Sequence, residues 1–136
     1  NKMLDWSRYP NFTEAEMACK HTGMTGVKPE LMEHLQALRN EVGALDVSSG
    51  YRAVAHPVEA SKSRAGTHTT GYAVDIRCFG GRAHKILDAA IKQGVWTGIG
   101  VNMTGDHEQR FIHLDCLPVE GWEGYEHIGR PNLWSY

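Results

Sequence analysis

The chain has 136 residues, of which 41% are hydrophobic and 22% charged, and its formal net charge is −2. This length fits one domain with a real core, and the composition is ordinary for a globular protein. A nearly neutral chain without a long basic run offers no electrostatic basis for binding nucleic acid, so we expect no nucleic-acid partner.

No apolar stretch approaches the roughly 20 residues that a membrane-spanning helix needs. The first residues also lack the apolar segment of a secretion signal, so we expect no membrane partner and no signal peptide in the sequence given. The three cysteines, Cys19, Cys78 and Cys116, have no close spacing and are expected to be free thiols.

Two helices are expected in the first third of the chain. Thr13-Glu14-Ala15-Glu16 is a capping-box pattern, which predicts a short helix running to about Lys20. Pro29 suits a first helical turn, and apolar residues then recur with the spacing of one helical face until Gly43. Residues 29–42 are therefore predicted to form an amphipathic helix.

A strand is predicted at residues 44–48, followed by a turn formed by Ser49-Gly50-Tyr51-Arg52. Residues 53–67 are polar, contain Pro57 and show no apolar period, which favours a surface loop. We expect this loop to form the rim of a site, because long loops within compact domains are often functional.

The segment Gly66–Cys78 contains the strongest motif of the chain. It places His68 and Asp75 seven positions apart, with Gly71 between them. The alternating run at residues 72–76 predicts a strand that carries the carboxylate of Asp75 into the fold.

The second half of the chain alternates between predicted helix and strand. We expect a helix from Ala83 that Gly94 closes, strands at residues 96–101 and 110–117, and a polar turn at residues 103–109. The tail, residues 118–136, is rich in Gly, Pro and aromatic residues and is expected to wrap the domain without regular structure.

His68, Asp75 and His113 are candidate ligands of one metal ion. In the strand predicted at residues 110–117, alternation puts His113 and Asp115 on one face. Two histidine nitrogens and one carboxylate oxygen suit a zinc ion that keeps a water as its fourth ligand, as catalytic sites do. A single strand histidine is most often just a hydrogen-bonded side chain, but three such residues after a Ser-Gly-Tyr-Arg turn favour the metal interpretation.

In this order, these motifs resemble those of the zinc D-Ala-D-Ala carboxypeptidase family. That family includes phage endolysins that cut L-alanyl-D-glutamate bonds and is related in fold to the hedgehog signalling domain. The resemblance covers nearly the whole chain. It implies an α+β fold, with residues 1–136 forming one small zinc peptidase domain in which an antiparallel sheet carries the zinc site and helices pack on one side.

The resemblance also implies roles for individual residues. It assigns one Zn²⁺ to His68, Asp75 and His113. It makes Arg52 the cation that holds the substrate and stabilises the developing oxyanion, a role that suits a guanidinium near a reacting carbonyl. Ser49 and Tyr51 would bind substrate beside it.

The general base is where the sequence departs from the family pattern. Several relatives have an acidic residue three positions before the last zinc histidine, where this chain has Arg110. Glu108 and Asp115 are equal candidates for the base, and His107 is a third. Asp115 could instead hold a histidine in its metal-binding tautomer.

The resulting hypothesis is a monomeric zinc metallopeptidase that hydrolyses a bond of the peptidoglycan stem peptide, as a D-Ala-D-Ala carboxypeptidase or an L-Ala-D-Glu endopeptidase. It would act in the periplasm or cell wall, as a phage lysin released from the host cytoplasm. The alternative, favoured by the missing acid at position 110, is a non-catalytic zinc-stabilised binding module. Trp96, Trp122 and Trp134 could stack on a glycan strand, but isolated aromatic residues are more often core, so none is assigned a role.

Overall fold

The computed structural model describes residues 3–62, 66–120 and 124–136, and its centre is a five-stranded sheet in the order β1-β2-β4-β3-β5. The strands are β1 (Asp46–Ser49), β2 (Ala73–Arg77), β3 (Gly98–Asn102), β4 (Phe111–Asp115) and β5 (Asn132–Ser135). The first four pair antiparallel, whereas β5 runs parallel to β3. The α+β class is confirmed, and the prediction of an antiparallel sheet is wrong at this edge.

The sheet is mixed because of where the chain lies after β4. Asp115, at the end of β4, pairs with Gly98, at the start of β3. The chain then leaves the sheet and returns to the same end, so that Asn132 also pairs with Gly98 and β5 runs beside β3 in the same direction. The tail therefore supplies a strand that was not predicted. This strand has only four residues, and the Gly and Pro residues around it favour irregular structure.

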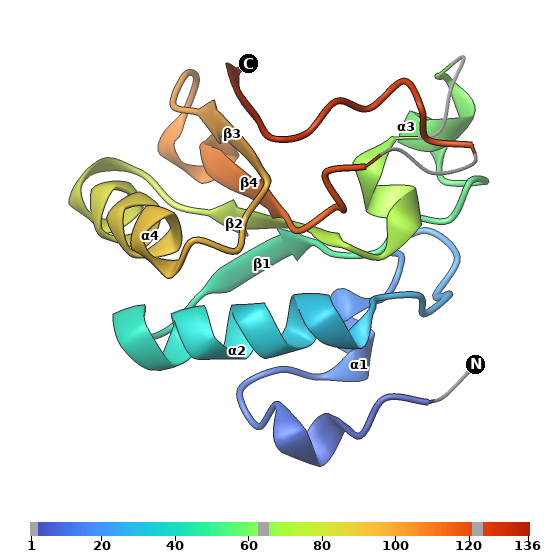
Figure 1. The fold of residues 1–136 in the computed structure, drawn as a ribbon, viewed down its shortest axis with the longest axis horizontal. Helices are drawn as coiled ribbons and strands as arrows, with labels where there is room; N and C mark the ends of the chain where they lie inside the picture. The colour runs from blue at the N-terminus through green and yellow to red at the C-terminus, as the bar shows by residue number, and fades with distance from the viewer. Residues whose placement is uncertain (1–2, 63–65, 121–123) are drawn as a thin grey trace.

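Two long helices lie below and beside the sheet in Figure 1, and the C-terminal segment, in red, runs over the opposite side. The helices are α1 (Glu14–Met17), α2 (Pro29–Val42), α3 (Pro57–Ala60) and α4 (Gly80–Gln93), with 3₁₀ turns η1 (Trp6–Arg8), η2 (Thr67–Thr70) and η3 (His107–Gln109). The bounds predicted for α2 are confirmed, and the capping box at Thr13 is present. α1 ends at Met17 rather than near Lys20.

The hydrophobic core lies between the long helices and one face of the sheet. Alternate residues of β2 and β4 are buried in it: Val74, Ile76, Ile112 and Leu114. Burying an aliphatic side chain of this size contributes roughly 1.5–3 kcal/mol, so these residues strongly specify the strand register. Asp75 and His113 lie between them in sequence and therefore project from the opposite face.

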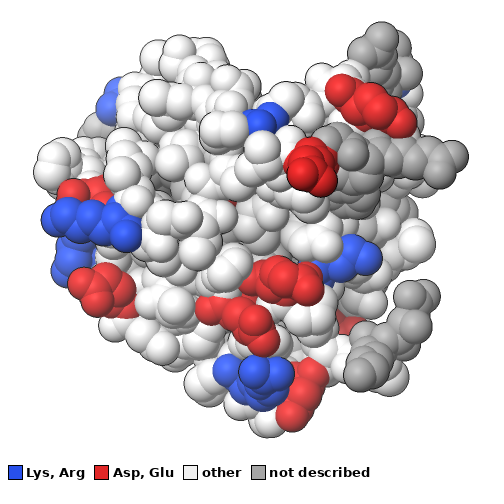
Figure 2. Space-filling model, viewed as in Figure 1, with Lys and Arg blue, Asp and Glu red and all other residues white. Residues whose placement is uncertain are grey.

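Figure 2 shows acidic and basic side chains interspersed over the face drawn there, rather than gathered by sign. Within the described ranges, every helix is too short or too polar to cross a membrane.

The segment predicted as a surface loop, residues 53–67, contains more structure than expected. It includes α3, and it folds around the buried side chain of Glu59. The Glu59 carboxylate accepts hydrogen bonds from the backbone N–H of Gly66 and the ammonium of Lys62, both at 2.9 Å. Residues 63–65 of this loop lie outside the described part of the chain.

Gly71 joins η2 to β2 in a conformation that other residues avoid. Its φ is 83°, and a Cβ added there would collide with the carbonyl oxygen of Gly26. We expect Gly71→Ala to lower the free energy of unfolding by at least about 2 kcal/mol, measured by urea denaturation. Gly81→Ala is the control, because a Cβ at that helical position meets nothing within 4 Å. That variant should match the wild type or exceed it by up to about 1 kcal/mol, and equal stability of the two variants would contradict the prediction.

Candidate metal centre

The candidate centre lies on the sheet face away from the core. Ser49 of β1, Asp75 of β2 and His113 of β4 are opposed in register, and the row continues through Gly100 of β3 to Trp134 of β5. Directly opposed residues of neighbouring strands share a face and can interact. Two predicted metal ligands are therefore neighbours because β2 and β4 are adjacent.

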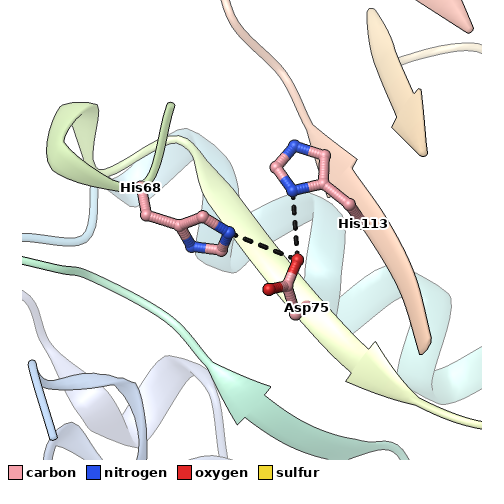
Figure 3. A group of neighbouring side chains, drawn as sticks. All are labelled: His68, Asp75 and His113. Carbon is pink, nitrogen blue, oxygen red and sulfur yellow. Dashed lines mark hydrogen bonds and ion pairs between the residues drawn. The ribbon is translucent and has the colours of Figure 1, made fainter. Parts of the chain in front are cut away.

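His68 reaches the same place from η2, the turn that precedes β2. Figure 3 shows the rings of His68 and His113 both directed at Asp75. Nε2 of His68 lies 3.2 Å from Oδ1 of Asp75, and Nδ1 of His113 lies 3.0 Å from the same oxygen. All three side chains are buried, and one ligand atom from each lies within 4.8 Å of the others. The structure thus groups the three predicted ligands.

The other hydrogen bonds of the two histidines fix which ring nitrogen carries a proton. Nδ1 of His68 lies 2.8 Å from the carbonyl oxygen of Gly50. Nε2 of His113 lies 2.7 Å from a carboxylate oxygen of Asp115. Both partners are acceptors, so each of these nitrogens must donate a proton. In neutral rings, the nitrogens that face Asp75 therefore carry lone pairs.

With neutral rings, three electron-pair donors lie within 4.8 Å of one another, and a divalent cation between them would satisfy all three. The separations of 3.2 and 3.0 Å between the histidine nitrogens and the Asp75 oxygen are close to the roughly 3.3 Å expected for tetrahedral zinc ligands with bonds near 2.0–2.1 Å. Two nitrogens and one oxygen also leave a fourth position for water. The donor set fits zinc.

The two carboxylates of the centre are held in their ionised form. Burial disfavours the ionised form of Asp75, but His68 and His113 outweigh it and lower its pKa well below the ordinary value. Burial also opposes ionisation of Asp115, yet hydrogen bonds from His113 and Arg130 lower its pKa to about 2. Burial disfavours protonated His113, but Asp115 and Asp75 outweigh this and raise its pKa.

Arg52 lies beside the ligands, next to Ser49. Its Nε donates to Oγ of Ser49 at 3.2 Å, while Nη1 lies 3.4 Å from Glu59 and Nη2 lies 3.6 Å from Asp75. The side chain is 20% exposed, so Arg52 lies at the edge of the buried centre. The structure therefore brings Arg52 and Ser49 to the candidate ligands.

The candidates for the general base occupy different places. Asp115 is fully buried, and its oxygens accept hydrogen bonds from His113 and Arg130. Glu108 and His107 lie in η3, where they line a hollow that also includes Phe79. Among the described residues, no hydrogen bond or ion pair joins Glu108 or His107 to the candidate metal ligands. Only Asp115 of the three is next to them.

Other residues noted in the sequence are dispersed. The ring of Tyr51 is partly buried against the core, and Trp96 is buried within it. Trp134 lies next to the centre, with its ring centroid 5.1 Å from that of His113. Trp122 lies outside the described residues.

Glu59 is a functional candidate that sequence reasoning missed. Its side chain is 1% exposed and accepts hydrogen bonds from Arg52, Lys62 and the backbone of Gly66. Burial opposes its charge, but the bonds from Lys62 and Gly66 outweigh it and lower its pKa. Glu59 thereby orients Arg52. The polar sequence around Glu59 does not predict that this side chain is buried, because the burial depends on the fold of the loop.

Arg130 was missed as well, and Trp134 was assigned no role. Nε and Nη2 of Arg130 donate to the two oxygens of Asp115 at 2.9 and 2.7 Å. Both residues come from the tail, and only the return of β5 to the sheet brings them to the centre. No local sequence pattern predicts such a return.

A comparison with family models matches residues 10–115 to the family described as Peptidase M15, whose members are in general zinc-dependent. The matched range includes Arg52 and the three candidate ligands, and it ends before β5. Comparisons with curated proteins and with solved structures find no significant match.

Proposed function

Because the chain belongs to the peptidase M15 family, we propose that it is a zinc peptidase that hydrolyses a bond in the stem peptide of bacterial peptidoglycan. The family supports peptidase activity, and the grouping of the three candidate ligands supports a metal-dependent one. The proposal includes D-Ala-D-Ala carboxypeptidase and L-Ala-D-Glu endopeptidase action. The substrate places this activity in the periplasm or cell wall, and a phage lysin released from the host cytoplasm is the setting we propose.

The observation that carries the proposal is that both histidines direct a ring nitrogen at Asp75 while their other ring nitrogen is hydrogen-bonded elsewhere. Gly50 and Asp115 each accept a proton from the outer nitrogen of a histidine ring. In neutral rings, the inner nitrogens then carry lone pairs beside the carboxylate of Asp75.

Zinc bound at this point would polarise the scissile carbonyl and lower the pKa of a water toward neutrality. Arg52 would bind the carbonyl oxygen, where negative charge grows in the transition state. Ser49 and Glu59 hold the guanidinium of Arg52 in place, which reduces the reorganisation needed during the reaction.

Asp115 acts in this proposal as a positioning residue rather than as the general base. It is fully buried, and both of its oxygens already accept hydrogen bonds. It keeps the proton on Nε2 of His113, so that Nδ1 remains available to the metal.

Mass spectrometry of purified peptidoglycan, incubated with the protein in the presence and absence of a zinc chelator, tests the proposal. We expect peptides cut within the stem, with release that stops when the chelator is added and returns with added zinc. The product masses distinguish loss of the terminal D-Ala from cleavage between L-Ala and D-Glu.

A different result would support the non-catalytic alternative. Zinc binding without any product from peptidoglycan or from D-Ala-D-Ala peptides would overturn the enzyme proposal. The protein would then be a zinc-stabilised binding module, which the presence of Arg110 in place of an acid favours.

A further inference from the structure

We propose that Arg130 is a positioning residue for the metal centre, which it serves by holding Asp115 in the orientation that fixes the ring of His113. The inference rests on the zinc site proposed above. It adds a residue from outside the range that matches the family, residues 10–115.

The contacts between Arg130 and Asp115 form a two-point clamp. Nε donates to Oδ1 at 2.9 Å, and Nη2 donates to Oδ2 at 2.7 Å. The side chain of Arg130 is 5% exposed and that of Asp115 is fully buried, so solvent does not compete for the pair. Such parallel bonds fix the plane of a carboxylate as well as its position.

The carboxylate of Asp115, held by Arg130, in turn orients the ring of His113. Oδ2 of Asp115 also accepts the proton of Nε2 of His113 at 2.7 Å. Because the bond to Asp115 sets the rotation of the imidazole, it also sets the direction of Nδ1 toward Asp75. Arg130, Asp115 and His113 thus form a chain that ends at the metal position.

Two glycines of β3 provide the space for this chain. A Cβ at Gly98 would collide with both oxygens of Asp115 and with Nε of Arg130. A Cβ at Gly100 would collide with the indole of Trp134. The tail side chains therefore lie directly over the backbone of β3 on the face that carries the site.

Trp134 packs against both Arg130 and His113. Its ring centroid is 5.1 Å from the guanidinium carbon of Arg130 and 5.1 Å from the ring centroid of His113. The first contact has cation–π geometry, which holds Arg130 against the sheet. The indole thus covers both the positioning residue and the ligand that it serves.

The test is the zinc affinity of Arg130→Gln, measured by competition with a chromophoric chelator. We expect affinity about 10- to 100-fold weaker than in the wild type, the usual effect of losing a partner that orients a metal ligand. Arg130→Lys keeps the charge but not the two-point geometry, and it should restore only part of the loss. Arg8→Gln is the matched control, because Arg8 is 62% exposed in a surface pair with Glu33, and it should bind zinc as the wild type does.

A second readout separates positioning from general destabilisation. In the zinc-loaded protein, ¹H–¹⁵N spectra of the histidine rings should show the Nε2–H tautomer for His113, and cobalt(II) substitution should give a tetrahedral absorption spectrum. We expect Arg130→Gln to broaden the His113 signals and to change the cobalt spectrum. If this variant does not fold, Arg130→Lys is measured in the same way.

The outcomes are distinguishable. A folded Arg130 variant with unchanged zinc affinity and unchanged spectra would overturn the inference and leave the proposed function intact. A wild-type protein that binds no zinc would overturn both.

Discussion

Replacing Asp75 with asparagine is expected to weaken zinc binding by at least roughly 100-fold, because removal even of an outer partner of a metal ligand often costs 10- to 100-fold. Oδ1 of Asp75 is the atom that both histidines face, and its negative charge is the main attraction for a cation at that point. The measurement is chelator competition on the metal-free protein, with circular dichroism as a check that the variant is folded.

Asp46→Asn is the matched control for this prediction. Asp46 begins β1 and is 61% exposed, where it pairs with Arg77 on the surface. Its replacement should leave zinc affinity unchanged. If Asp75→Asn is folded and binds zinc as tightly as Asp46→Asn does, the ion does not bind at the predicted ligands.

Arg52→Lys is expected to lower kcat for stem-peptide hydrolysis by about 100- to 1,000-fold, the usual effect of losing a donor to a developing oxyanion. Lysine keeps the charge but cannot reproduce the fork that reaches Ser49, Glu59 and Asp75 together. Zinc affinity should be retained, because the removed group is a cation and not a ligand. Steady-state kinetics and chelator competition on the same sample measure both quantities.

Arg77→Lys controls for the substitution itself. Arg77 pairs with Asp46 on the exposed end of β2, so its exchange should change neither kcat nor zinc affinity. Parallel loss of activity and zinc in Arg52→Lys would show that Arg52 is structural, and unchanged kcat would remove it from the proposed mechanism.

Much of the fold was readable because the local patterns agree with the tertiary structure. α2 runs over the residues that its proline, apolar spacing and terminal glycine predict. Alternation along β4 predicted His113 and Asp115 on one face, and in the structure the aliphatic residues Ile112 and Leu114 between and beside them are buried in the core. These features depend on the side-chain periodicity of single elements, which a sequence contains in full.

The parts that were missed depend on contacts between distant segments. The burial of Glu59 follows from the way its loop closes onto Gly66. Arg130 and Trp134 join the centre because β5 runs beside β3. A strand of only four residues is too short to show a hydrophobic alternation from which this pairing could be predicted. The role of Asp115 could be stated from sequence only as one of two alternatives, because its partner Arg130 was unknown.

The row that runs from Ser49 through Asp75, His113 and Gly100 to Trp134 also predicts where homologous chains can change length. Deleting one residue inside β4 would turn an aliphatic neighbour of His113 toward the metal and send the imidazole into the core. Insertions and deletions should therefore accumulate in the connections between strands. Within β2 and β4, natural variation should be confined to substitutions.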